Sequence, residues 1–157
     1  MRAALGLGSN LGDRRAHLDA AVAGLPGVVA VSSTHETRPV GGPPQGLYLN
    51  AAVVVETDLD PRGLLAVARR LEYAAGRNRS GGGQTERWEP RTLDVDVLLC
   101  DDLVVCDDGP PALTIPHPRL AERAFVLAPL AEIARDWVVP GTDKTVEQLL
   151  EDLQVRP

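Results

Sequence analysis

The chain has 157 residues and a net charge of −6, so it is long enough for one domain with a substantial core, and we expect a single domain over residues 1–157. The acidic balance argues against a general nucleic-acid-binding protein. No window approaches the roughly 20 apolar residues of a membrane span, and the N-terminus lacks the pattern of a secretory signal peptide. The two cysteines form no C-x-x-C motif, which argues against a zinc site and is typical of reduced thiols in a cytoplasmic protein.

Hydrophobic periodicity divides the chain into short apolar strands and helices with apolar residues three and four positions apart. Asp60 and Pro61 are suited to begin the second helix, as its N-cap and first residue. The predicted elements are a strand at 2–7, a helix at 13–24, strands at 28–35 and 48–57, a helix from 61 to 75, a strand at 92–100, a hairpin strand within 101–108, an extended segment at 113–120, a helix at 122–134 kinked at Pro129, and a helix at 146–153. This order predicts an α+β fold with a ferredoxin-like β-α-β-β-α-β core, an antiparallel sheet with two helices on one face, and C-terminal additions.

Two loops interrupt this pattern. The loop at residues 38–46 holds three prolines and three glycines, which excludes both a helix and a regular strand. The loop at residues 77–91 contains S-G-G-G and is long for a compact domain. We expect it either to close over a substrate or to be a tolerated surface insertion.

Two aspartates lie in an otherwise apolar strand, within the run R-W-E-P-R-T-L-D-V-D-V-L-L at residues 87–99. Because side chains alternate along a strand, Asp94 and Asp96 share one face and their apolar neighbours share the other. Carboxylates about 7 Å apart along a strand can converge on a pair of divalent ions, and hard oxygen ligands favour Mg²⁺. The alternative is a pair of solvent-exposed acids at a sheet edge.

Six arginines flank the aspartates in the sequence. Arginine binds phosphate oxygens through a planar fork of donors. Acids that hold a metal, beside arginines that hold phosphate, predict a nucleoside triphosphate site, whereas the alternative is ion pairing with nearby acids. The arginines are Arg77, Arg79, Arg87, Arg91, Arg119 and Arg123.

Three further positions suit a flat or anionic ligand. Trp88 lies in the loop at residues 77–91, the basic loop, where it could stack on a planar ligand or anchor the loop over the core. Tyr48 and Asn50 share a face of their strand and would suit a heterocycle, or would simply form a polar sheet face. His117, in the turn P-H-P, could donate to a phosphate or play a structural part.

Four blocks occur in order along nearly the whole chain: G-L-G-S-N-L-G-D, Y-L-N-A-A-V, R-W-x-P-R-T-L-D-V-D-V-L-L and L-T-I-P-H-P-R-L-x-E-R-x-F-V-L. Together they closely resemble the 6-hydroxymethyl-7,8-dihydropterin pyrophosphokinases of folate biosynthesis. The resemblance implies a ferredoxin-like fold, ATP as co-substrate, two Mg²⁺ ions, and transfer of the terminal pyrophosphoryl unit of ATP to the pterin hydroxymethyl group with release of AMP. We expect a cytoplasmic monomer that acts on small molecules, with no nucleic-acid or membrane partner.

The resemblance also implies roles for individual residues. Asp94 and Asp96 would bind both metal ions, and Trp88 and Phe125 would sandwich the pterin. The expected catalytic residues are Arg77, Arg79, Arg91, Asp94 and Asp96. The residues expected at ATP are Glu72, Arg77, Arg79, Arg91, Val97, Leu113, Thr114, His117 and Arg123. The residues expected at the pterin are Thr37, Arg38, Val40, Tyr48, Asn50, Trp88, Asp94 and Phe125.

Some positions depart from the family pattern. The segment between Arg79 and Trp88 is longer than in compact members, Arg38 stands where proline is common, and Pro118 stands where some members carry tyrosine. These departures affect the placement of the basic loop, the entry to the loop at 38–46, and one contact to the nucleotide.

Two other classes of protein remain open. A metal-dependent nucleotidyltransferase would release pyrophosphate, but there the acid pair follows a Gly-Ser dipeptide by about a dozen residues, whereas Ser9 and Asp94 are 85 positions apart. A ferredoxin-like ligand-sensing module would explain the fold but not two strand aspartates among six arginines.

Overall fold

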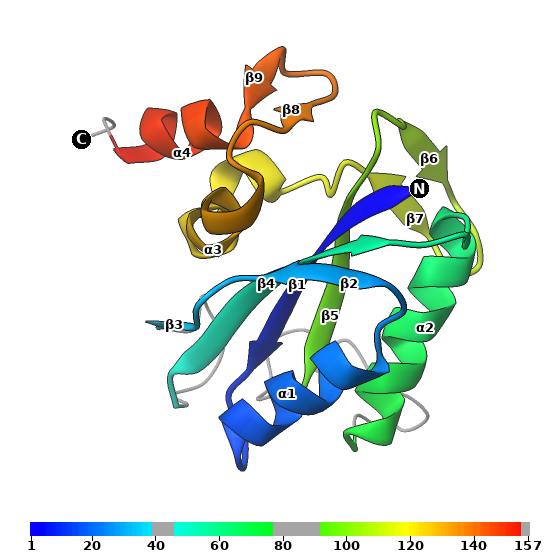
Figure 1. Cartoon of the computed structure of the whole chain (residues 1–157), viewed down its shortest axis with the longest axis vertical. Helices are drawn as coiled ribbons and strands as arrows, with labels where there is room; N and C mark the ends of the chain where they lie inside the picture. The colour runs from blue at the N-terminus through cyan, green and yellow to red at the C-terminus, as the bar shows by residue number, and fades with distance from the viewer. Residues whose placement is uncertain (39–45, 77–91, 155–157) are drawn as a thin grey trace.

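The structure is a computed structural model that describes residues 1–38, 46–76 and 92–154. Its central sheet has the strand order β2-β4-β1-β5, with β3 also paired to β4, and every pairing is antiparallel (Figure 1). The strands are β1 (Arg2–Ser9), β2 (Val28–Val31), β3 (His35–Thr37), β4 (Tyr48–Glu56) and β5 (Asp94–Cys100). The predicted α+β class and antiparallel sheet are therefore confirmed, and the strand order is that of two interleaved β-α-β units.

The two crossover helices form as their sequence signals predict. Helix α1 (Arg14–Gly24) begins at Asp13, whose side chain accepts a hydrogen bond from the Ala16 N–H. Helix α2 (Pro61–Ala74) begins at Asp60, whose carboxylate accepts from the Gly63 N–H at 2.7 Å. Each cap satisfies a backbone donor that has no partner inside its helix.

The sheet is covered on both faces, as Figure 1 shows, with α1 and α2 on one side and the C-terminal helices on the other. Strand β4 is buried from Leu49 to Val55, so it reads as a continuous apolar run rather than an alternating one. Its alternate residues pack into two separate cores, Val53 with α1 and α2 and Val54 with the C-terminal helices. The additions that the sequence analysis left unplaced thus form the third layer.

The C-terminal layer, formed by two helices, is accompanied by a 3₁₀ turn and two short hairpins beyond the main sheet. Trp137 connects this layer to the sheet. Its ring lies 4.2 Å from the guanidinium of Arg2 in β1, and its Nε1 donates to the carbonyl of Asp101, the residue after β5. The elements are β6 (Val105–Asp107), β7 (Leu113–Ile115), a 3₁₀ turn at Leu120–Glu122, α3 (Ala124–Ala134), β8 (Val138–Val139), β9 (Lys144–Thr145) and α4 (Val146–Gln154).

One predicted strand is wrong in its extent. The single strand expected at 28–35 is two strands, because the ladder with β4 is interrupted after Val31. The Ser32 hydroxyl accepts the Ala52 N–H at 2.8 Å, and so replaces the backbone carbonyl that a continuous ladder would use. The predicted helix at 122–134 likewise begins as a 3₁₀ turn and becomes α-helical only at Ala124, with Pro129 inside it.

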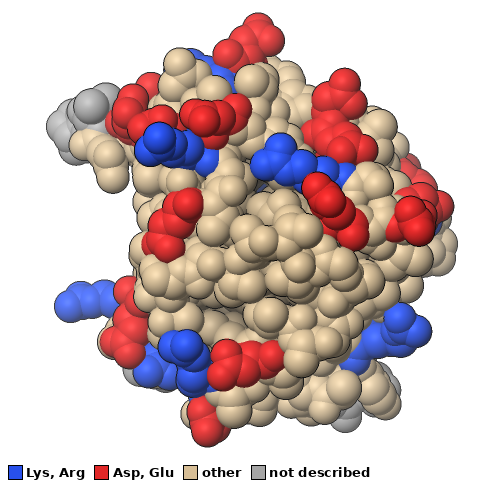
Figure 2. Space-filling model, in the orientation of Figure 1, with Lys and Arg blue, Asp and Glu red and all other residues tan. Residues whose placement is uncertain are grey.

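The surface carries charges of both signs. Figure 2 shows one face, on which acidic and basic side chains are interspersed around a central area that carries neither. None of the helices in the described ranges is long and apolar enough to cross a membrane.

Candidate active site

A row of polar groups crosses one end of the sheet, on the face that α3 covers elsewhere. In the register of the sheet, Asn50 of β4 lies opposite Gly8 of β1, and Gly8 lies opposite Asp94 of β5. His35 of β3 lies on the other side of Asn50. Four strands thus contribute to one line, with an amide and a carboxylate separated by two strand spacings, about 10 Å.

The two aspartates lie on the face that their spacing predicts. Val95 and Val97 pack into the core under α1 and α2, so Asp94 and Asp96 point to the opposite face, where both are half-buried. Among the described residues no three His, Cys, Asp or Glu side chains gather as a metal site. Two carboxylates fit an ion that takes its other ligands from water and substrate phosphates, which is the usual manner of Mg²⁺.

Two glycines of β1, Gly6 and Gly8, lie between β4, which carries Asn50, and β5, which carries the aspartates, and form the floor of the site. A Cβ on Gly8 would lie 3.3 Å from Asn50 Oδ1 and 3.7 Å from Tyr48 Cδ1, and one on Gly6 would meet Leu98 at 3.5 Å. Both glycines were missed as site residues by the sequence analysis. Their alternate spacing in an apolar strand was the available signal, since glycine inside a strand often marks the close approach of a ligand or another chain segment.

The Asn50 amide has a fixed orientation. Its Nδ2 donates to Thr37 Oγ1 at 2.6 Å and to the His35 carbonyl at 3.4 Å, and the side chain is almost wholly buried. With both amide hydrogens engaged, the acceptor Oδ1 faces the Gly8 floor. Thr37 and Asn50 are therefore brought together with Tyr48 as predicted, whereas Arg38 is exposed.

Glu72 supports β5 from the side. Its carboxylate is buried, and Oε2 accepts the Val95 N–H at 2.9 Å. Val95 lies between the two aspartates, and β5 is the outer strand of the sheet, so this bond satisfies an edge donor and holds the aspartate-bearing backbone. The resemblance alone had implied a place for Glu72 beside the nucleotide.

His117 is held as a neutral donor. Its backbone N–H donates to the Leu98 carbonyl, and its Nδ1 accepts the Arg119 N–H at 3.2 Å. Burial, and then the charges of Arg123 and Arg119, lower the pKa of His117 from its ordinary 6.5 to about 4. At neutral pH the single proton therefore resides on Nε2, which presents an uncharged N–H.

The start of α3 adds positive potential near His117. Arg123 is the N-cap residue of α3, and its carbonyl accepts from Val126 and Leu127. The positive end of a helix dipole beside two arginines suits an anion such as phosphate. Phe125, in the first turn, is half-buried, with the Arg123 guanidinium 5.6 Å from the centre of its ring.

Three predicted nucleotide contacts differ in exposure. Val97 and Leu113 are buried in the core under α1 and α2, so we expect only their backbone to meet a ligand. Thr114, between two buried residues of β7, is exposed. The predicted residues that lie outside the described ranges are Val40, Arg77, Arg79, Arg87, Trp88 and Arg91.

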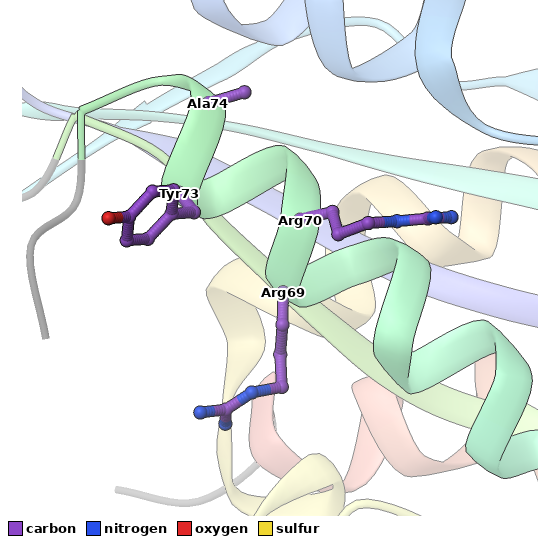
Figure 3. Close-up of a pocket in the computed structure, with 4 residues that line it drawn as sticks. All are labelled: Arg69, Arg70, Tyr73 and Ala74. Carbon is purple, nitrogen blue, oxygen red and sulfur yellow. The ribbon is translucent and has the colours of Figure 1, made fainter.

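A shallow hollow of about 300 Å³ lies elsewhere, on the outer side of α2. Figure 3 shows its lining, with Arg69, Arg70 and Tyr73 projecting in different directions from the helix. The Tyr73 side chain is largely exposed, and none of the predicted site residues within the described ranges lines this hollow. We therefore place the active site at the polar end of the sheet and not here.

Comparison with known proteins shows the family of the chain. Residues 4–135 match the family model described as 7,8-dihydro-6-hydroxymethylpterin-pyrophosphokinase (HPPK). The chain belongs to this family. An HPPK relative from Methylorubrum extorquens, named 2-amino-4-hydroxy-6-hydroxymethyldihydropteridine pyrophosphokinase, is 47% identical over 97% of this chain and 93% of the relative. A relative of the same name from Bacillus subtilis is 42% identical over 92% of this chain and 84% of the relative.

Solved structures show the same fold at lower identity. The wild-type HPPK-DHPS of Plasmodium falciparum superposes with a TM-score of 0.71 at 14% identity, over 96% of this chain. This chain spans only 44% of that longer chain. The likeness supports the HPPK fold and, at this identity, nothing finer.

The lowered pKa of His117 predicts a loss of stability in acid. Because the folded pKa lies near 4 and the unfolded one near 6.5, only the unfolded state takes up this proton as the pH falls through that window. We expect the free energy of unfolding to fall less steeply from pH 6.5 to 4 in His117→Asn than in the wild type, as measured by urea denaturation.

The matched control is His17→Asn, which removes a histidine in α1. Asp107 and Glu132, whose pKa values are also lowered by their hydrogen bonds, contribute equally to all three proteins. An identical pH dependence in His117→Asn and the wild type would contradict the neutral state of His117.

Proposed function

We propose that this chain transfers the terminal pyrophosphoryl group of ATP to the hydroxymethyl group of 6-hydroxymethyl-7,8-dihydropterin, as a step of folate biosynthesis. The observation that carries the proposal is the line of Asn50, Gly8 and Asp94 across three strands. In this line Asn50, whose amide could read a heterocycle, and Asp94, whose carboxylate could bind a metal ion, lie on either side of Gly8, in a chain of the HPPK family.

The pterin half of the site is the side of Asn50. Its Oδ1 would accept from the N–H groups along the edge of the pterin, and its amide cannot turn away because Thr37 and the His35 carbonyl hold Nδ2. Phe125 would cover the ring from α3. Trp88 would supply the second aromatic face, Arg38 and Val40 backbone contacts, and Tyr48 a further edge contact.

The ATP half is the side of His117. The uncharged Nε2–H, the Arg123 guanidinium and the positive end of α3 would engage phosphate oxygens. Arg77, Arg79 and Arg91 would join them, and Leu113 and Thr114 would flank the adenine. In the ligand-free protein the neutral imidazole already presents its Nε2–H as a donor at physiological pH.

Asp94 and Asp96 would hold two Mg²⁺ ions, which when bound neutralise charge on the phosphate oxygens. The chain itself holds the two substrates in line, so that the hydroxyl oxygen bonds to the β-phosphorus while the bond from that phosphorus to the AMP oxygen breaks. The hydroxyl proton leaves in the same step, and we propose that the Asp96 carboxylate assists its departure. The arginines stabilise the charge that develops on AMP.

We further propose that the chain works as a single-domain cytoplasmic monomer that acts on the small-molecule substrates ATP and the pterin. All the described helices pack on one sheet or on a helix that does so, which supports a single folding unit.

Phosphorus NMR of the purified chain with ATP, Mg²⁺ and the pterin tests the reaction. We expect AMP and a new diphosphate ester. ADP with a monophosphate ester would keep the site and overturn the reaction, and pyrophosphate with an adenylylated pterin would identify a nucleotidyltransferase. Unchanged substrates with folded, ligand-saturated protein would indicate a binding module.

The same assay tests Asp96. We expect Asp96→Asn to lower kcat by roughly 100-fold, because it removes a carboxylate that would hold the Mg²⁺ ions against the reacting phosphate and assist the hydroxyl proton's departure. The exposed Asp136→Asn serves as the control with the same change of charge. Near-normal turnover of Asp96→Asn with metal bound would rule out a role for its carboxylate in the proton's departure.

Gly8→Ala tests the floor of the site. The added methyl group would lie 3.3 Å from Asn50 Oδ1 and push the amide from its position. We expect KM for the pterin to rise about tenfold, or ~1.4 kcal/mol, with KM for ATP unchanged. Gly6→Ala, whose methyl group would meet the Leu98 side chain at an ordinary 3.5 Å, compares the other half of the floor, opposite Asp96, where we expect a smaller rise in KM for the pterin. Equal effects of the two substitutions would argue against close approach of the pterin at Gly8.

A further inference from the structure

A carboxylate of α3 holds the segment that enters β3. Glu132 Oε1 accepts the Ser33 backbone N–H at 2.8 Å, and Oε2 accepts the Ser33 hydroxyl at 2.7 Å. Oε2 also lies 2.5 Å from His35 Nε2. The bonds from Ser33, first from its backbone and then from its hydroxyl, and then the bond from His35, lower the pKa of Glu132. We call Glu132, Ser33 and His35 the Glu132 cluster, and of the three His35 also belongs to the polar row of the site.

The strand that the Glu132 cluster holds is short and lies at the edge of the sheet. β3 is three residues long, pairs with β4 in the part of the chain that the structure describes, and is separated from β2 by the break after Val31. A strand this short at a sheet edge is weakly held by its ladder alone. Side-chain contacts from the neighbouring layers must therefore decide where it lies.

The position of β3 sets the position of the Asn50 amide. The two acceptors of Asn50 Nδ2 are Thr37 Oγ1 and the His35 carbonyl, and both belong to β3. His35 therefore takes part in two contacts, with its ring bound to Glu132 and its carbonyl to Asn50. A shift of His35 would move both acceptors and so free the amide to rotate.

The Glu132 cluster also links the two sides of the pterin half. Glu132 and Phe125 are seven residues apart on α3, which places them two turns apart on the same side of the helix. The cluster thus sets the distance between the helix that carries Phe125 and the strand that carries Thr37. On the opposite face of β3, Glu36 pairs with Arg14 at 2.9 Å, and Arg14 also donates to the Leu47 carbonyl.

We propose that Glu132 is a positioning residue for pterin recognition, acting through Ser33 and His35 on the Thr37–Asn50 contact. The inference rests on the proposed function, because it assigns the Asn50 amide to the pterin. Glu132 touches neither substrate, so its removal acts on the binding of one substrate only. A purely structural tie between α3 and the sheet would weaken the fold without that selectivity.

The first test compares Glu132→Ala and the conservative Glu132→Gln in the full chain. Glutamine keeps an acceptor for the Ser33 donors but loses the charge. We expect KM for the pterin to rise about tenfold in Glu132→Ala and less in Glu132→Gln, with kcat and KM for ATP within about twofold of the wild type. The control is Asp152→Asn, which breaks the exposed ion pair of Lys144 with Asp152 at the other end of the C-terminal layer.

The second test is a double-mutant cycle with Thr37→Val, which removes one acceptor of the amide. If Glu132 acts through that contact, the effect of Glu132→Gln on the pterin KM shrinks to less than about twofold in the Thr37→Val background. A double mutant whose pterin KM rises by the product of the two single-mutant effects would overturn the inference. Equal changes in the KM for the pterin and the KM for ATP would overturn it as well.

The third test needs no turnover. In the ligand-free protein the side-chain amide signals of Asn50 in nitrogen NMR should shift in Glu132→Gln and stay in place in Asp152→Asn. Failure of the proposed function and failure of this inference are distinguishable. A wild-type chain that makes no AMP would defeat the function, whereas an active wild type with an unchanged Asn50 signal and pterin KM in Glu132→Ala would defeat the inference alone.

Discussion

The register between β1 and β5 is the constraint on which the site depends. Gly8 lies opposite Asp94 and Gly6 opposite Asp96, and the pairing then shifts between Leu5 and Ala4. A slip of one residue would turn both carboxylates into the apolar core under α1 and α2, at a large cost in desolvation. The apolar side chains on the other face of β5 therefore hold the aspartates in place as firmly as any polar contact does.

Two features reinforce this register. The irregularity between β1 and β5 allows Leu98 and Leu99 both to pack under the C-terminal helices, while Val95 and Val97 pack under α1 and α2. Glu72 then occupies the edge donor of Val95. One end of β5 is thus anchored in both cores, and the other end carries the acids. The site lies where the C-terminal layer stops covering the sheet.

The polar elements of the site are held by contacts that join distant parts of the chain. Glu132 and His35 are 97 positions apart, and Glu72 and Val95 are 23 apart. Each contact fixes a backbone segment that carries a group of the proposed site, and both carboxylate-bound segments belong to strands, β3 and β5. The helices and the doubly covered sheet thus form the scaffold of the proposed site. Segments at the edges of the sheet carry its polar groups, which is common for binding sites.

The sequence by itself determined the order of elements, the helix cap at Asp60, and the shared face of Asp94 and Asp96, because these depend on local periodicity and on neighbours within one turn or one strand. It also named Tyr48, Asn50 and His117 as candidate ligand-binding residues, and the family resemblance added Phe125. Only the tertiary structure decided that Gly6 and Gly8 form the floor between them, that Glu72 binds a backbone donor, that His117 is neutral, and that the strand expected at 28–35 divides after Val31. The physical reason is that periodicity tells which face a side chain takes, while strand pairing and burial decide which groups meet it there.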